Sequence, residues 1–100
     1  MLLAVDVGNT VMVLGIYDRE TLRAEWTVNT DRGKSSDEYG LLFRNLIEYE
    51  GFAPSDVTAI AIASSVPPVV PTLERMCHKY FRLKPLVLGP GVKTGMVIRY

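Results

Sequence analysis

Apolar residues in the first third of the chain form three short runs that are separated by turn-forming residues. Residues 2–7 are mostly apolar and lead into a Gly-Asn-Thr turn at 8–10, the pattern of a buried strand followed by a turn. Residues 11–17 are β-branched and apolar, whereas residues 22–28 alternate between apolar and polar positions. Such alternation is typical of a strand with one wet face near a sheet edge. The three runs predict an antiparallel meander.

Two later segments carry helical patterns. Ser35 and Glu38 have the spacing of a capping box, and Gly51 stands where a C-terminal glycine is expected. Between them, apolar residues recur on one helix face: Tyr39, Leu42, Phe43, Leu46 and Ile47. Pro67-Pro68 favours a second helix start, because proline is tolerated in the first turn. The predicted apolar face of this second helix comprises Val70, Leu73, Met76, Cys77, Tyr80 and Phe81.

The remaining apolar runs complete a sheet. Residues 57–63 form a continuous apolar stretch, as in a strand covered on both faces, and residues 85–88 predict a last short strand. Residues 96–100 are compatible with the start of another strand. The predicted order is strand, strand, strand, helix, strand, helix, strand. This order indicates an α/β fold in which helices pack on a mixed sheet of about five strands.

Composition places the chain among soluble globular domains. Of its 100 residues, 48% are hydrophobic and 22% are charged, so the chain is expected to fold around one core. Eleven bases balance eleven acids, which excludes a general nucleic-acid binder. No apolar run reaches the ~18 residues of a membrane span, and the N-terminus lacks the basic region of a signal peptide. We therefore expect a cytoplasmic protein without a membrane partner.

Few side chains are suited to metal or thiol chemistry. Cys77 is the chain's one cysteine, which excludes a disulfide framework and a multi-cysteine zinc site. It lies on the predicted apolar helix face and is interpreted as core, while His78 is expected to be exposed. Residues 74–100 hold six bases and one acid. The simplest interpretation is a solvated helix face, and the alternative is a positive rim near an anionic ligand.

The strongest candidate for chemistry is the strand–turn junction at residues 6–10. Gly8 has no Cβ and lets backbone N–H groups approach a ligand, and Asn9 and Thr10 add polar side chains. Together they could cradle a phosphate, with Asp6 holding Mg²⁺ directly or through water. A plain hairpin turn explains the same pattern equally well. The spacing excludes a Walker A loop.

A second glycine-rich segment covers residues 89–95, Gly-Pro-Gly-Val-Lys-Thr-Gly. Its G-x-G pair lacks the following helix of a dinucleotide fingerprint, and its Lys-Thr-Gly lacks the S-x-x-K partner of β-lactamases. Alone it is best interpreted as an irregular loop. No Ser-His-Asp set is indicated either.

Four segments in order resemble the N-terminal part of type III pantothenate kinases, a family of the acetate-and-sugar-kinase/Hsp70/actin superfamily. The segments are the opening strand and loop at 2–10, Thr30 with the Asp-Glu-Tyr-Gly at 37–40, Ala-Ser-Ser-Val-Pro-Pro at 63–68, and the stretch 89–100. The resemblance implies an actin-like (ribonuclease H-like) half-domain over 1–100, with the family's second domain absent. It implies transfer of the γ-phosphate of ATP to pantothenate, the first step of coenzyme A biosynthesis. Mg²⁺, a monovalent cation (K⁺ or NH₄⁺) and a homodimer are implied as well.

The resemblance also assigns residues. The ATP phosphate site would comprise Asp6, Val7, Gly8, Asn9, Thr10, Val11, Met12 and Val13. Asp6 would organise the metal, and Tyr100 would line the pantothenate pocket. The family's catalytic aspartate would follow Tyr100, so residues 1–100 alone are expected to be inactive. Val11-Met12 depart from the family's usual Asn and small polar or aliphatic residue, which puts ATP affinity in doubt. The alternatives are a non-catalytic binding or dimerisation module and a different kinase of the superfamily.

Overall fold

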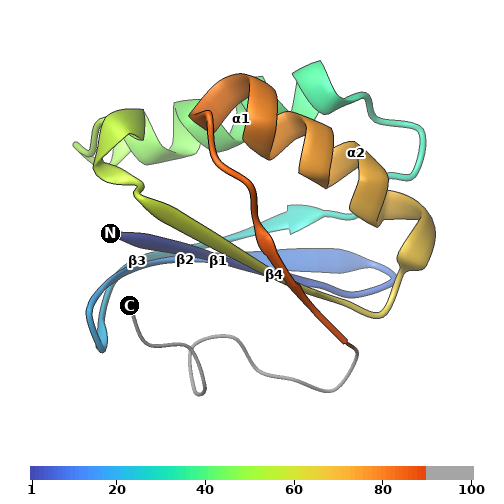
Figure 1. The fold of residues 1–100 in the computed structure, drawn as a ribbon, viewed down its shortest axis with the longest axis horizontal. Helices are drawn as coiled ribbons and strands as arrows, with labels where there is room; N and C mark the ends of the chain where they lie inside the picture. The colour runs from blue at the N-terminus through green and yellow to red at the C-terminus, as the bar shows by residue number, and fades with distance from the viewer. Residues whose placement is uncertain (90–100) are drawn as a thin grey trace.

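The computed structural model describes residues 1–89, and in them a single sheet carries two helices on one face (Figure 1). The strands are β1 (Leu2–Val7), β2 (Val11–Asp18), β3 (Thr21–Asn29), β4 (Ala59–Ser64) and β5 (Leu86–Leu88). The α-helices are α1 (Ser36–Tyr49) and α2 (Val70–Met76), and short helical turns occupy Pro54–Asp56, Pro67–Val69 and Cys77–Phe81. Neither α-helix in this part of the chain has the length and apolarity that a bilayer crossing requires.

The sheet is mixed, as predicted. Its order is β3-β2-β1-β4-β5. The first three strands pair antiparallel, whereas β4 runs parallel to β1 and β5 runs parallel to β4. Each parallel pairing needs a crossover, and the two helices provide these connections. Because β1 and β4 are parallel with Val7 opposite Ser64, the turns that follow them lie at the same edge of the sheet.

The core lies between the sheet and the two helices. Period-two alternation turns Leu3, Val5 and Val7 of β1 toward the helices, where α1 contributes Phe43 and Ile47. All five side chains are almost inaccessible to solvent. Residues 61 and 63 of β4, which face the other way, are alanines with 1% and 6% exposure. The prediction that this strand is covered on both faces is therefore confirmed.

Helix α1 begins and ends as its sequence predicts. The Glu38 N–H donates to Ser35 Oγ over 3.1 Å, and the Ser35 N–H donates to Glu38 Oε1 over 2.9 Å, which completes the capping box. Those hydrogen bonds hold the pKa of Glu38 below its ordinary value. Gly51 has a φ of 92°, the left-handed conformation that glycine adopts readily after a helix.

The second helix differs from the prediction. The prolines start a 3₁₀ turn at Pro67–Val69 before α2, and a π-helical turn at Cys77–Phe81 follows it. The tighter 3₁₀ turn shifts the helical phase, so Val69 is buried and Val70, predicted on the apolar face, is only partly buried. The backbone leaves the π-helical turn at Arg82, whose φ is 57°.

Strand β3 is an edge strand, as predicted, but its alternation is incomplete. Ala24, Trp26 and Val28 are partly buried, whereas Leu22 remains 44% exposed. A register shift between Ile16 and Tyr17 in the neighbouring strand changes the pairing at that end, so that Leu22 lies opposite Tyr17. The predicted glycine-rich loop beyond Gly89, the strand over 96–100 and Tyr100 lie outside the described residues.

Candidate phosphate-binding site

The turn over residues 8–10 joins β1 to β2 at the sheet edge where β1 and β4 both end. The Gly8 N–H donates to the Val11 carbonyl over 2.9 Å and closes the turn. A Cβ at Gly8 would lie 3.1 Å from that carbonyl oxygen, so glycine is the residue that fits here without a backbone shift. Asn9 and Thr10 are exposed at the tip.

Three carbonyl groups, two in the turn and one at the end of β1, accept hydrogen bonds from the segments that follow β3 and β4. The Val7 carbonyl accepts from the Ser65 N–H over 3.1 Å and from Ser65 Oγ over 3.2 Å. The Gly8 carbonyl accepts from Thr30 Oγ1 over 2.8 Å, and the Thr10 carbonyl accepts from the Thr30 N–H over 2.8 Å. The turn is therefore fixed from both sides, by the residues that follow β3 and β4.

The predicted phosphate-site residues share one hairpin but not one surface. In the β1–β2 pairing, Asp6 lies opposite Val13, and Val7 lies opposite Met12. Val7 and Met12 are buried in the core beneath the helices, with 4% and 0% exposure. Asp6 and Val13 lie on the other sheet face and are partly accessible. The side chains of Val7 and Met12 therefore cannot contact a ligand at the loop.

This geometry separates the two departures from the family pattern. Met12 is a core residue, and an apolar side chain is what its buried position requires. Val11, in contrast, is 39% exposed beside the turn. Of the two departures that the resemblance implies, the one at position 11 is therefore the one that lies at an accessible position.

Asp6 is the residue predicted to bind Mg²⁺. It is partly buried on the sheet face opposite the helices, one residue before the end of β1. Residues 1–89 contain no cluster of three or more His, Cys, Asp or Glu side chains that could hold a metal. Mg²⁺ commonly binds proteins through one or two carboxylates and completes its shell with water and phosphate oxygens. A single carboxylate beside a phosphate loop is compatible with that mode of binding.

The segment 37–40, Asp-Glu-Tyr-Gly, joins the two helices. The Tyr80 hydroxyl donates to Asp37 Oδ1 over 2.7 Å, and Lys79 Nζ lies 2.8 Å from the same oxygen. Those contacts lower the pKa of Asp37 and raise the pKa of Lys79. A Cβ at Gly40 would collide with the Tyr80 ring, so glycine allows α1 and the π-helical turn to approach. Asp37 and Gly40 therefore have a structural role.

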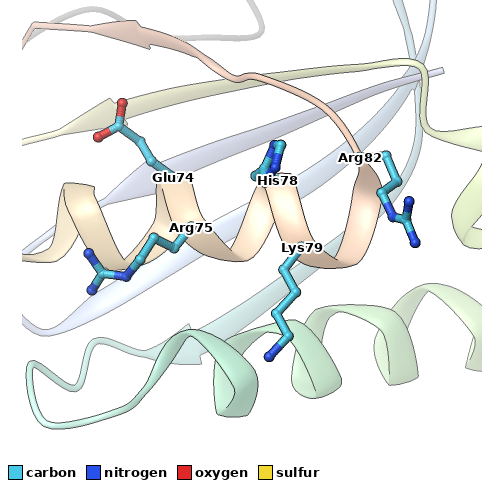
Figure 2. A pocket seen from close by; sticks show the side chains of 5 residues that line it. All are labelled: Glu74, Arg75, His78, Lys79 and Arg82. Atoms are coloured by element: carbon cyan, nitrogen blue, oxygen red, sulfur yellow. The ribbon is translucent and has the colours of Figure 1, made fainter.

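The basic face formed by α2 and the π-helical turn shares Lys79 with this network. A hollow of about 670 Å³ is lined by Glu74, Arg75, His78, Lys79 and Arg82. Figure 2 shows that these side chains diverge: Glu74 and His78 extend from one side of the helix, and Arg75 and Lys79 from the other, toward α1. Lys79 is already paired with Asp37. The arrangement supports the interpretation as a solvated helix face.

Cys77 and His78 behave as predicted. Cys77 is buried, and burial is the main cause that raises its pKa to about 12. Its thiol is therefore protonated at neutral pH and unsuited to nucleophilic chemistry. His78 is exposed.

Sequence reasoning assigned no role in the site to Thr30 or Ser65. Thr30 follows the end of β3, and Ser65 follows the end of β4. The strand register places both residues beside the turn. Their contacts depend on strand neighbours far away in sequence, 22 residues for Thr30 and 58 for Ser65. The one available signal was that both belong to the segments that resemble the kinase family.

Comparisons with known proteins agree on family and fold. The sequence profile of the type III pantothenate kinase family matches residues 2–100. The "Type III pantothenate kinase 2" of Symbiobacterium thermophilum is 63% identical over all 100 residues, and this chain spans 38% of its length.

Two crystal structures share the fold at low sequence identity. The ROK hexokinase of Thermus thermophilus aligns with a TM-score of 0.65 and 13% identity, over 88% of this chain and 34% of its own. A protein of Porphyromonas gingivalis, provisionally assigned as an N-acetylglucosamine kinase, aligns with a TM-score of 0.65 and 14% identity, over 90% of this chain and 34% of its own. These sugar kinases support the predicted actin-like architecture of the mixed sheet.

Proposed function

The chain belongs to the type III pantothenate kinase family, and we propose that the protein containing it transfers the γ-phosphate of ATP to pantothenate. The product is 4′-phosphopantothenate, and the reaction is the first step of coenzyme A biosynthesis. Residues 1–100 are the N-terminal, actin-like domain of this enzyme. The observation that carries the proposal is the turn at residues 8–10, whose carbonyls are fixed from behind while Asn9 and Thr10 face solvent.

Each residue around the turn has a distinct task in this proposal. Gly8 lets the phosphates approach the backbone, and Asn9 and Thr10 supply polar groups at the tip. Asp6 holds Mg²⁺, which neutralises charge on the phosphate oxygens when it is bound. Val7, Met12 and the neighbouring core residues keep the hairpin in place beneath the helices. Phosphoryl transfer depends mostly on positioning and charge stabilisation, and a rigid hairpin of this kind provides both.

The remaining parts of the reaction are assigned to other segments. Tyr100 lines the pantothenate pocket in this proposal. The catalytic aspartate, the adenosine pocket and the site for K⁺ or NH₄⁺ belong to the part of the relatives that this chain does not span. The enzyme acts as a cytoplasmic homodimer. Residues 1–100 alone are therefore expected to be inactive, because positioning worth roughly 7–11 kcal/mol of barrier requires a complete site.

A chimera tests the proposal. It joins residues 1–100 to the remaining length of the Symbiobacterium thermophilum relative, which is 63% identical over the shared segment. We expect the chimera to release ADP only when pantothenate, ATP and Mg²⁺ are all present, and the Asp6→Asn variant to lose at least about 100-fold in kcat. The intact relative is the positive control. A folded chimera that leaves pantothenate unmodified while the relative is active would contradict the proposal.

The alternative of a non-catalytic dimerisation module gains no support from the hairpin. The apolar pair Val11-Met12 fits it only slightly, because Met12 is accounted for by its place in the core. We therefore retain the kinase as the one proposed function.

A further inference from the structure

We propose that Thr30 is a positioning residue for the turn at residues 8–10, and that Tyr39 holds Thr30 in place through the backbone of Asp31. The inference rests on the proposed function, because it concerns how the turn is prepared to bind the phosphates of ATP. Neither residue contacts the ligand in this proposal.

Thr30 binds two carbonyls of the turn at once. Its hydroxyl donates to the Gly8 carbonyl over 2.8 Å, and its backbone N–H donates to the Thr10 carbonyl over 2.8 Å. The hydroxyl contact is partly buried, so water competes with it less than at an exposed site. One residue therefore sets the direction of two peptide groups in the turn.

The direction of the Gly8 carbonyl determines that of the next amide. All peptide bonds described in residues 1–89 are trans, and in a planar trans peptide the C=O and the following N–H point in opposite directions. Since the Gly8 carbonyl points to Thr30, the Asn9 N–H points away from Thr30. Backbone N–H groups aimed outward from a glycine turn are the donors that bind phosphate oxygens. Without the Thr30 hydroxyl, this peptide would be free to rotate.

Tyr39 fixes the residue that follows Thr30. The Tyr39 hydroxyl accepts from the Asp31 N–H over 2.9 Å and donates to the Asp31 carbonyl over 2.7 Å. Its ring is fully buried and packs edge-on against Phe43, with ring centroids 6.1 Å apart. Burial raises the pKa of Tyr39, so the hydroxyl keeps the proton that it donates. Helix α1 therefore determines where Asp31, and with it Thr30, can lie.

A matched control lies at the start of the same helix. Ser36 Oγ donates to the Thr72 carbonyl over 2.9 Å, and this contact is also partly buried. It is a hydroxyl-to-carbonyl hydrogen bond like that of Thr30, but it joins α1 to α2 and leaves the turn untouched. Ser36→Ala therefore measures what the loss of such a bond does to the fold alone.

The test measures ATP–Mg²⁺ affinity and steady-state kinetics of the chimera carrying Thr30→Val, Thr30→Ser, Tyr39→Phe or Ser36→Ala. We expect Thr30→Val to weaken ATP binding and raise the KM for ATP roughly tenfold, because small misplacements of a phosphate site are costly, while the KM for pantothenate is unchanged. Thr30→Ser keeps the hydroxyl and should restore affinity. Tyr39→Phe should raise the KM for ATP by a smaller factor, and Ser36→Ala should leave it unchanged.

The outcomes separate this inference from the proposed function. If Thr30→Val binds ATP as tightly as the unaltered chimera, even with a lower melting temperature, Thr30 is only structural and the inference is overturned. If the unaltered chimera binds ATP but leaves pantothenate unmodified, the proposed function fails, and the affinity of Thr30→Val still decides the role of Thr30. If the unaltered chimera neither binds ATP nor reacts, both are overturned.

Discussion

The turn at residues 8–10 and the basic face of α2 present polar groups in opposite ways. The turn has little charge, but its carbonyls are bound by Thr30 and Ser65 and its position is fixed. The basic face carries Arg75 on α2 together with His78 and Arg82 from the π-helical turn and its end, and these side chains diverge around an open hollow (Figure 2). In the proposed function the turn would therefore bind phosphate through its restrained geometry, more than through a high local charge.

The largest effect expected within the turn itself follows from adding one methyl group. Gly8→Ala places a Cβ 3.1 Å from the Val11 carbonyl, which is backbone and must shift. We expect the kcat/KM of the chimera for ATP to fall about 10- to 100-fold. Gly33→Ala is the control, because its Cβ would meet Asp31 Oδ1 at an ordinary 3.4 Å. Equal losses in the two variants would show that the turn has no special requirement.

The next effect concerns stability. Tyr39→Phe leaves the N–H and the carbonyl of Asp31 without their partner in a partly buried setting. Such a loss costs about 1–3 kcal/mol of unfolding free energy, measured by urea denaturation. Tyr80→Phe removes one exposed hydrogen bond to Asp37 and should cost less than Tyr39→Phe, because water competes for an exposed contact. A reversed ranking would show that the buried hydroxyl does not anchor the loop.

A smaller effect is expected on acidification. Because Lys79 and Tyr80 hold the pKa of Asp37 below its ordinary value, the ionised carboxylate stabilises the fold at neutral pH. This contribution is complete above the unfolded pKa and disappears as pH falls below about 4, through the folded pKa. Melting temperatures between pH 6 and about 3 should therefore fall less steeply for Asp37→Asn. An unchanged slope would exclude this contribution.

The smallest effect belongs to the basic face. The double substitution Arg75→Ala with Arg82→Ala removes two cations that line the hollow and that point away from each other. We expect the KM of the chimera for ATP to change by less than about twofold, because exposed and unfocused charges contribute little. A severalfold increase would instead assign an anion-binding role to this face.

Much of the fold follows from local patterns that the sequence contains. Apolar runs identify β1 and β2, alternation identifies β3, and the Ser35–Glu38 capping box gives the start of α1, because these signals depend on residues close in sequence. The phase of α2 could not be predicted, because the 3₁₀ turn at Pro67–Val69 depends on how the chain leaves β4. Local sequence patterns therefore predict the individual helices and strands, but not how one element packs against the next.

The candidate site shows the same contrast between what the sequence predicts and what depends on packing. The resemblance brings Asp6 and Val13 into one hairpin, and the structure places them opposite each other. The resemblance also assigns Val7 and Met12 to the phosphate site, whereas the structure buries their side chains in the core. The contacts of Thr30 and Tyr39 could not be predicted, because they depend on the register between β2 and β3 and on how α1 packs.

The most direct test of the account is a titration of the isotopically labelled chimera with ATP and Mg²⁺, followed through backbone amide NMR shifts. The account predicts that the shifts concentrate at residues 8–11 and at Thr30, while the amides of residues 75–82 stay in place. Shifts confined to residues 75–82, or none at the turn when the chimera is saturated with ATP, would contradict the claim that this turn binds the phosphates.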